Sequence, residues 1–292
     1  MKYALILGFV AASGAAASLT TDVRNAVAGH AFPQAEAYVR EYRAAHGVTP
    51  ELVTAMSWMA RGALNQKAYD QAEAYASETY QLATGLLKTR PLDQEPVLPI
   101  GLGAAIEVQA QALAARGQTT EAVSYLAGQL KTYGATTIAT RIQKNIHLLS
   151  LEGKRAPELE GVSLPKGRPT LLFFWAHWCG DCRAEAPILT RIQAEFGPKG
   201  LVLIGPTQKY GYVAGGEGAP PETELRYIET VRREYYGSIV ASPAVVSEKN
   251  FREYGVSTTP TLVLIDRDGV VRMYHPGGMT YDELRARLEA LR

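Results

Sequence analysis

Cysteine is nearly absent from this chain: its 292 residues contain two, Cys179 and Cys182. A framework of structural disulfides is therefore excluded, because it needs several separated pairs. With His177, the two cysteines offer three candidate metal ligands, fewer than the four of a structural zinc site, and the other histidines show no paired spacing. We expect no metal and no cofactor other than the cysteine pair itself.

An excess of charge of one sign is also lacking. Lysine and arginine total 30 and the acidic residues 29, which gives a formal net charge of +1. Nothing in this balance favours an acidic surface as partner, and we expect no nucleic-acid binding. The content of apolar residues, 47%, is ordinary for a globular protein.

Long apolar runs are missing except near the N-terminus, where Lys2 precedes an apolar stretch and small residues continue to Ala17. This is the pattern of a secretory signal peptide, which we place at residues 1–17. The apolar stretch is too short to span a bilayer comfortably. We therefore expect export to the periplasm or the medium, into an oxidising compartment, with no stable membrane span after cleavage.

Residues 20–153 are rich in alanine, and apolar residues recur at spacings of three and four. Such spacing predicts amphipathic helices, so we expect an all-helical domain. Thr49 is a suitable cap for one helix, and Pro50 suits the first position of that helix. The predicted helices lie near residues 33–45, 50–65, 68–88, 100–116, 119–132 and 136–151.

Two of these helices begin alike, with "AYDQAEAY" from Ala68 and "QTTEAVSY" from Gln118. Each places a small residue, Ala72 or Ala122, where neighbouring helices approach closely, and Gly117 precedes the second copy. The pattern resembles a degenerate tetratricopeptide-type helical hairpin, although the copies lie about fifty residues apart instead of ~34. An alanine-rich bundle without repeats is the alternative.

The pattern changes after a segment rich in proline, glycine and charge near residues 153–156. We predict an α/β domain over residues 156–292, in which continuous apolar runs form strands buried on both faces. Thr280 and Glu283 fit a capping box at the start of the last helix. Strands are expected at 170–176, 201–206, 259–266 and 270–276, and helices at 183–196, 220–235 and 280–291.

Cys179 falls where the first strand of this domain ends and a helix begins. Unpaired N–H groups and the helix dipole stabilise a thiolate there and lower its pKa, so Cys179 is the expected nucleophile. Cys182, one turn later, can attack the mixed disulfide and release the partner, with Gly180 and Asp181 between the two cysteines. A disulfide closing so short a loop adds little stability, which favours a redox pair over a staple.

Two stretches, "FFWAHWCGDCRAEAPIL" and "VSTTPTLVLIDRDGVV", resemble the TlpA/ResA-like exported branch of the thioredoxin superfamily. Trp178 matches the tryptophan of the family motif W-C-x-x-C, and Pro187 matches a proline within its helix. The resemblance covers about residues 155–292 and implies a thioredoxin-like fold, a central mixed sheet flanked by helices. It also implies a cis peptide before Pro260 that faces the cysteines, with Thr259 offering backbone hydrogen bonds to an extended substrate.

The chain departs from thioredoxin proper at Phe173, where that protein has a buried aspartate that assists the resolving thiol. We expect Glu185 to be a solvated helix residue, His177 to lie on the surface, Trp175 in the core and Trp178 beside the disulfide. No proton acceptor for Cys182 can be named among the acids of the long glycine-rich segment after the second strand, which are Glu217, Glu222 and Glu224.

The resemblance implies a thiol–disulfide oxidoreductase that reduces, or less readily oxidises, disulfides of exported proteins. Its partners would be protein thiols or disulfides and an upstream electron donor. One alternative is a partner-binding helical protein whose thioredoxin fold is mainly a scaffold. Another is a thiol peroxidase, but the threonine of the Thr-x-x-Cys pocket typical of that chemistry is missing before Cys179.

Overall fold

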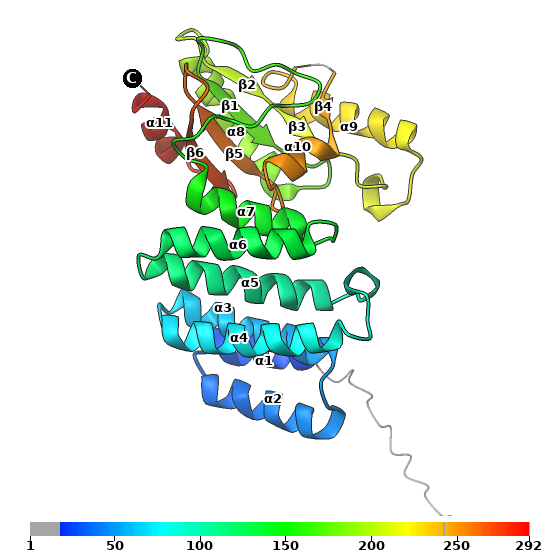
Figure 1. Ribbon diagram of the computed structural model, residues 1–292. Coiled ribbons are helices and arrows are strands. Elements are labelled where there is room, and N and C mark those ends of the chain that lie inside the picture. The colour runs from blue at the N-terminus through cyan, green and yellow to red at the C-terminus, as the bar shows by residue number, and fades with distance from the viewer. Residues whose placement is uncertain (1–17, 242, 292) are drawn as a thin grey trace, which may run out of the picture.

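The computed structural model describes residues 18–241 and 243–291, so the predicted signal peptide lies outside the described residues. Figure 1 shows a column of stacked helices that leads into an α/β unit containing the sheet. The helices of the column agree closely with those predicted from spacing, and α1 is an addition. They are α1 (Leu19–Ala28), α2 (Phe32–His46), α3 (Pro50–Asn65), α4 (Tyr69–Leu86), α5 (Leu98–Ala115), α6 (Thr119–Tyr133) and α7 (Ala139–Ser150).

Helix α1 was not among the predicted helices, although it falls almost wholly within the all-helical domain predicted for residues 20–153. The side chain of Ser18 caps this helix by accepting a hydrogen bond from the Thr21 N–H. Thr49 caps α3 in the same way, with Pro50 at the first position, as predicted.

The turns inside three successive helix pairs, α1–α2, α3–α4 and α5–α6, share one geometry. Each contains a residue with positive φ: His30 (59°), Lys67 (60°) and Gly117 (83°). The next residue donates its N–H to a carbonyl in the last turn of the preceding helix, which satisfies that end of the helix. These hydrogen bonds are Ala31 to Ala26 (2.8 Å), Ala68 to Ala63 (2.9 Å) and Gln118 to Leu113 (3.0 Å).

A fully buried alanine follows each turn at the same offset, namely Ala35, Ala72 and Ala122. Ala72 and Ala122 are the small residues that the sequence predicted at places where neighbouring helices approach closely. The helical hairpin thus occurs three times, and the first copy is an addition to the two that were predicted. A longer loop, which contains the 3-10 turn Leu92–Gln94, separates α4 from α5 and explains the wide spacing of the predicted copies.

Helix α5 is long and apolar enough to cross a membrane, and it alone meets this criterion within the described part of the chain. More than half of the helix is buried inside the protein, where it contacts α3, α4, α6 and α7. A helix that is apolar around most of its circumference is expected at such a place in a core. Its position between other helices therefore accounts for its composition.

The α/β unit contains a four-stranded sheet in the order β2-β1-β5-β6. Strand β1 runs parallel to β2 and antiparallel to β5, and β5 runs antiparallel to β6, so the sheet is mixed, as expected. Its strands are β1 (Thr170–Phe174), β2 (Val202–Ile204), β5 (Thr261–Ile265) and β6 (Val271–Pro276). The helices are α8 (Gly180–Phe196), α9 (Pro221–Tyr236), α10 (Glu248–Glu253) and α11 (Tyr281–Glu289).

The side chains of β1 point alternately into two cores. Leu171 and Phe173 belong to the core with α8, α9 and α11, whereas Leu172 and Phe174 belong to the core that contains α10. Burial on both faces is the reason for the continuous apolar run in the sequence. A short parallel pair, β3 (Pro206–Thr207) with β4 (Val245–Val246), and the six-residue α10 were not predicted, because segments so short carry no measurable periodicity.

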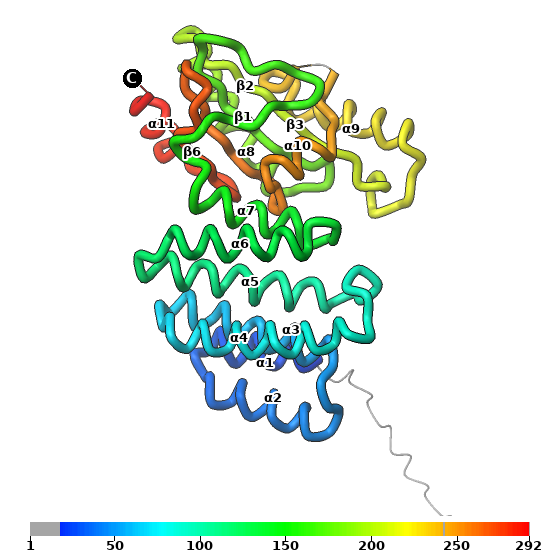
Figure 2. The backbone as a smooth tube through the Cα atoms, in the orientation of Figure 1, coloured from blue at the N-terminus to red at the C-terminus, as the bar shows by residue number. Residues whose placement is uncertain are grey.

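Helix α7 joins the helical column to the α/β unit, and Figure 2 shows it between α6 and the sheet region. His147 Nε2 lies 2.9 Å from the Glu253 carbonyl oxygen at the end of α10. Gly255 has φ +61°, and a Cβ placed on it would lie 2.4 Å from the Lys144 backbone nitrogen. The helical column and the α/β unit are thus in contact, with the backbone near Gly255 lying against the backbone of α7. Their division at 20–153 and 156–292 stays a prediction.

Candidate active site at Cys179 and Cys182

The two cysteines lie where β1 passes into α8. Cys179 is the N-cap of α8, and its sulfur accepts a hydrogen bond from the Cys182 N–H at 3.0 Å. The two residues are joined by a disulfide with their Cα atoms 5.3 Å apart. Both are buried, while Gly180 and Asp181 between them are exposed. The first sulfur therefore sits among the unpaired N–H groups of a helix start, which stabilise a thiolate.

The predicted second motif faces this pair. The Thr259–Pro260 peptide is cis, as the resemblance implies. Cys179 Sγ lies 3.4 Å from the carbonyl oxygen of Thr259, although the two residues are 80 positions apart. A backbone hydrogen bond stabilises the same loop, because the Gly277 N–H donates to the Pro260 carbonyl at 2.8 Å.

Trp178 is the exposed member of the site, with 48% of its surface accessible. Its ring meets the edge of Tyr210, with 5.5 Å between centroids. Trp175 is fully buried, as predicted, and its indole N–H donates to the Gly205 carbonyl. The two tryptophans thus differ in role, since one belongs to the core and the other is available to a partner.

His177 is fully buried, so its expected position on the surface is wrong. Its Nε2 lies 3.1 Å from Glu224 Oε1, and three tyrosine rings surround the imidazole edge-on. Burial lowers the pKa of His177, and hydrogen bonding to Glu224 only partly offsets this effect. A neutral imidazole is expected at physiological pH, with the Nε2 proton directed at the carboxylate. The tyrosines are Tyr210, Tyr212 and Tyr227.

Glu224 fixes the long segment that follows β3. Its carboxylate accepts hydrogen bonds from the backbone N–H groups of Tyr210 and Gly211, in addition to His177. The other two acids of that region, Glu217 and Glu222, are exposed. Because Glu224 is the only one of the three that is buried, it is a structural anchor that ties the segment to the residue preceding Trp178.

Glu185 is 4% exposed, so the expectation of a solvated helix position is wrong. It lies on α8 one turn after Cys182, and both carboxylate oxygens lie 3.2 Å from the Met279 backbone nitrogen. Burial raises the pKa of Glu185 to about 6, with the Met279 hydrogen bond acting in the opposite direction. A Cβ on Gly278 would lie 2.6 Å from its Oε2, so a glycine there leaves room for the carboxylate.

Phe173 lies in an aromatic cluster in place of the buried aspartate of thioredoxin proper. It is fully buried, and its ring centroid lies 5.4 Å from that of Tyr236, which also contacts the ring of Trp175. The phenylalanine side chain has no polar atom, so it needs neither a hydrogen-bond partner nor a buried water there. Among the described residues, Glu185 is the buried carboxylate that follows Cys182 on the same helix face.

A groove of about 560 Å³ opens beside the disulfide. Trp178, Tyr210 and Thr259 form the part next to the cysteines, and α10 contributes Arg252. The far wall includes Thr140 of α7 and Thr137 just before it. The helical column therefore supplies part of the surface that a substrate at Cys179 would touch, which nothing in the sequence indicated.

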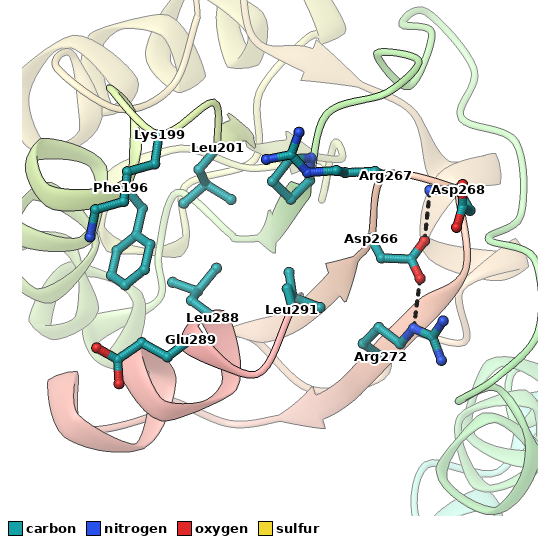
Figure 3. Close-up of a pocket in the computed structure, with 11 residues that line it drawn as sticks. Phe196, Lys199, Leu201, Asp266, Arg267, Asp268, Arg272, Leu288, Glu289 and Leu291 are labelled. Atoms are coloured by element: carbon teal, nitrogen blue, oxygen red, sulfur yellow. Dashed lines mark hydrogen bonds and ion pairs between the residues drawn. The ribbon is translucent and has the colours of Figure 1, made fainter.

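A second cavity in the α/β unit, of about 640 Å³, lies at the opposite end of β1 (Figure 3). Asp266 and Arg272 in its wall are already paired, since Asp266 Oδ2 lies 2.6 Å from Arg272 Nε and the other oxygen accepts backbone N–H groups. Within residues 18–241 and 243–291, no group of three or more acidic, histidine or cysteine side chains could hold a metal. The cysteine loop is thus a better candidate for an active site than this cavity.

Comparison with known proteins agrees with this geometry. Residues 216–292 match the family model of a thioredoxin-like domain. The chain is 28% identical over 149 residues to the thioredoxin-like protein YneN of Bacillus subtilis, covering 47% of this chain and 79% of YneN. It is 28% identical over 147 residues to the thiol-disulfide oxidoreductase ResA of Bacillus anthracis, covering 50% and 75%.

A third relative is the thiol:disulfide interchange protein DsbE of Xylella fastidiosa, 30% identical over 122 residues. That match covers 42% of this chain and spans about half of DsbE, 54%. Among solved structures, a thioredoxin family protein from Chlorobium tepidum covers 47% of this chain and 95% of its own, with 19% identity and a TM-score of 0.37.

The C-terminal part of the chain has a thioredoxin-like fold, with a mixed sheet and a cysteine pair at the start of α8, and residues 216–292 match the thioredoxin-like family model. Its relatives include thiol-disulfide oxidoreductases and interchange proteins, which supports a disulfide oxidoreductase of the thioredoxin-like kind.

Proposed function

We propose that this protein reduces disulfides in exported proteins, with Cys179 as nucleophile and Cys182 as resolving thiol. The observation that carries the proposal is the position of Cys179, which caps α8, is disulfide-bonded to Cys182 and adjoins the Thr259 carbonyl. The disulfide is the oxidised state, and the active reductant is the dithiol. No cofactor enters this chemistry.

In the first step, the Cys179 thiolate attacks one sulfur of the substrate disulfide. A bond forms between Cys179 and that sulfur, the substrate disulfide breaks, and the other substrate sulfur leaves as a thiolate. Helix-terminal N–H groups, including that of Cys182, favour the attacking thiolate. An extended substrate segment in the groove beside Thr259 would place its sulfur next to Cys179.

In the second step, Cys182 loses its proton and attacks Cys179 Sγ. The Cys179–Cys182 disulfide forms, the mixed disulfide between Cys179 and the substrate breaks, and the substrate sulfur leaves as a thiolate. We assign the proton to the Glu185 carboxylate, because this side chain is buried on the same helix face and has a pKa of about 6. A base with a pKa near ambient pH can accept a proton and release it in the next cycle.

Continuous turnover needs an upstream dithiol that reduces the Cys179–Cys182 disulfide again. The signal pattern at residues 1–17 supports action outside the cytoplasm. We place the substrates among exported proteins for the same reason, and the helical column offers surface for a protein partner.

The test is reduction of insulin disulfides by the full chain with dithiothreitol as donor. Cys179→Ser should abolish turnover, and Cys182→Ser should accumulate a mixed disulfide that mass spectrometry detects. If both variants keep wild-type turnover, the protein is not an oxidoreductase and the thioredoxin fold is a scaffold.

The direction of electron flow has its own measurement, the reduction potential of the Cys179–Cys182 pair. A value close to that of thioredoxin, about −270 mV, supports a reductant, whereas one near about −120 mV makes the protein an oxidant.

A further inference from the structure

Trp58, far from the cysteines in the helical column, is flanked by two arginines. The guanidinium carbon of Arg24, on α1, lies 5.1 Å from the centre of the indole, and that of Arg61, on α3, lies 4.8 Å from it. Both distances are typical of cation–π contacts. Two positive charges are therefore held beside one aromatic ring.

Neither guanidinium has a hydrogen-bonding or ion-pairing partner within the part of the chain that the structure describes. Arg61 is partly buried. Burial together with repulsion by Arg141 lowers its pKa to about 10, and attraction to Glu107 only partly offsets this effect. It therefore still carries its charge at neutral pH. A partly desolvated arginine that shares its nearby carboxylate, Glu107, with other cations is costly, and an incoming anion would reduce that cost.

The nearest carboxylate, Glu107 on α5, is already engaged. Its two oxygens lie 2.6 Å from Arg141 Nε and 3.2 Å from Lys144 Nζ. These two cations hold the pKa of Glu107 below its usual value in spite of its burial. The local charge is thus in positive excess, since Glu107 binds two cations on α7 and also attracts Arg61, while it forms an ion pair with neither Arg24 nor Arg61.

The two arginines and Trp58 line a cavity of about 500 Å³ between α1, α3 and α5. Val27, Leu64 and Val108 give it apolar surface, and the side chains of Asn65 and Gln66 lie exposed at its margin. This volume is in the range of ordinary ligand sites, which combine apolar walls with a few placed polar groups. Here the placed groups include two cations with free donors. Glu107 also lines the cavity, with its oxygens held by Arg141 and Lys144.

We propose that this cavity binds an acidic segment of a polypeptide. Carboxylates of the segment pair with Arg24 and Arg61, an apolar side chain of the segment lies against Trp58, and the exposed amide of Asn65 is available to its backbone. Arginine suits this task because its planar fork binds carboxylates in a bidentate way. The site is separate from the cysteine loop, so it can exist whether or not the proposed redox function holds.

The experiment measures fluorescence anisotropy of a fluorescein-labelled hexapeptide of alternating glutamate and leucine, blocked at both ends, with the full chain. We expect saturable binding, weaker by about tenfold or more when glutamine replaces each glutamate, since a hydrogen bond to a charged group is worth at least that factor. Arg24→Gln and Arg61→Gln should each weaken binding of the glutamate peptide by about tenfold.

Arg40→Gln is the matched control, because Arg40 is an exposed arginine of α2 that does not line the cavity. It should bind the peptide like the wild type, and all variants should reduce insulin at one common rate. Arg24 is exposed, so its variant carries the test if Arg61→Gln fails to give a wild-type circular dichroism spectrum.

The proposal would be overturned by no binding of the glutamate peptide, by equal binding of the two peptides, or by wild-type binding in both arginine variants. Succinate supplies the last comparison. If it displaces the labelled peptide at the concentration at which unlabelled peptide does, the cavity recognises small carboxylates and a polypeptide is not its ligand.

Discussion

At the scale of single residues, two buried carboxylates beside the cysteine loop are held in different ways. Glu224 is surrounded by donors, namely His177 Nε2 and two backbone N–H groups. Glu185 accepts from one N–H, that of Met279, and its pKa is raised to about 6. The first arrangement fixes a charge in place, and the second leaves a group that can exchange a proton.

Glu185→Gln tests the proton-acceptor role, because glutamine keeps an oxygen for the Met279 N–H but cannot titrate. The second step should slow by about 10², the lower range for general-base catalysis, while the first step is retained. Stopped-flow measurement of the two steps at pH 7 checks this. Equal slowing of both steps would contradict it.

Glu185→Gln should also change how the free energy of unfolding depends on pH. The pKa of Glu185 is raised in the folded state, so its stabilising contribution is complete below its ordinary pKa of 4.5 and is lost as pH rises through about 6. The free energy of unfolding of the wild type should fall, relative to Glu185→Gln, by about 2 kcal/mol across that window. Urea unfolding at several pH values measures it, and parallel curves would refute the assignment.

At the scale of elements, the three helix hairpins use different residues for one backbone conformation. His30 and Lys67 adopt positive φ, which costs a side-chain-bearing residue about 1 kcal/mol, whereas Gly117 adopts it freely. The buried alanines that follow let the paired helices approach closely. Turn geometry and alanine position, more than sequence identity, define the repeat.

Lys67→Gly should raise the free energy of unfolding by about 1 kcal/mol, because it removes the backbone strain at positive φ. Gly117→Ala is the reciprocal change and should lower it by a similar amount. A Cβ on Gly117 meets no atom within 4 Å, so the loss would report backbone strain alone. Urea unfolding checks both variants, and a loss of stability in Lys67→Gly would contradict the account.

At the scale of the whole molecule, α7 belongs to both parts of the protein. It packs on the helical column on one side, and on α10 and β6 on the other. Thr140 of this helix lines the groove that also contains Trp178 and Thr259. A protein substrate bound at Cys179 would therefore contact the helical column, whereas a small disulfide would not extend so far.

Thr140→Arg places a long charged side chain on that groove wall. It should lower kcat/KM for reduction of insulin by about tenfold and leave the rate with a small aromatic disulfide nearly unchanged. Thr132→Arg on α6 is the control, since Thr132 is exposed and does not line the groove. Equal losses with both substrates, or in both variants, would show that α7 has no part in substrate binding.

The sequence by itself determined the features that depend on neighbouring residues. Helix spacing, the cap at Thr49, the capping box at Thr280 and the junction of β1 with α8 all arise from contacts within a few positions, so local pattern predicts them. The cysteine pair stands out because cysteine is so scarce, whereas the cis peptide before Pro260 was implied by the resemblance to the thioredoxin superfamily.

Only the tertiary structure decided the surroundings of the cysteines. Glu185 is buried by Met279, which lies 94 positions later, and His177 by Glu224, which lies 47 later. A charged residue on a helix looks the same in sequence whether its face meets solvent or another segment, because burial is a property of the segment that covers it. For that reason the proposed proton acceptor Glu185, the position of α7 at the groove and the arginine cavity at Trp58 became visible only in the folded chain.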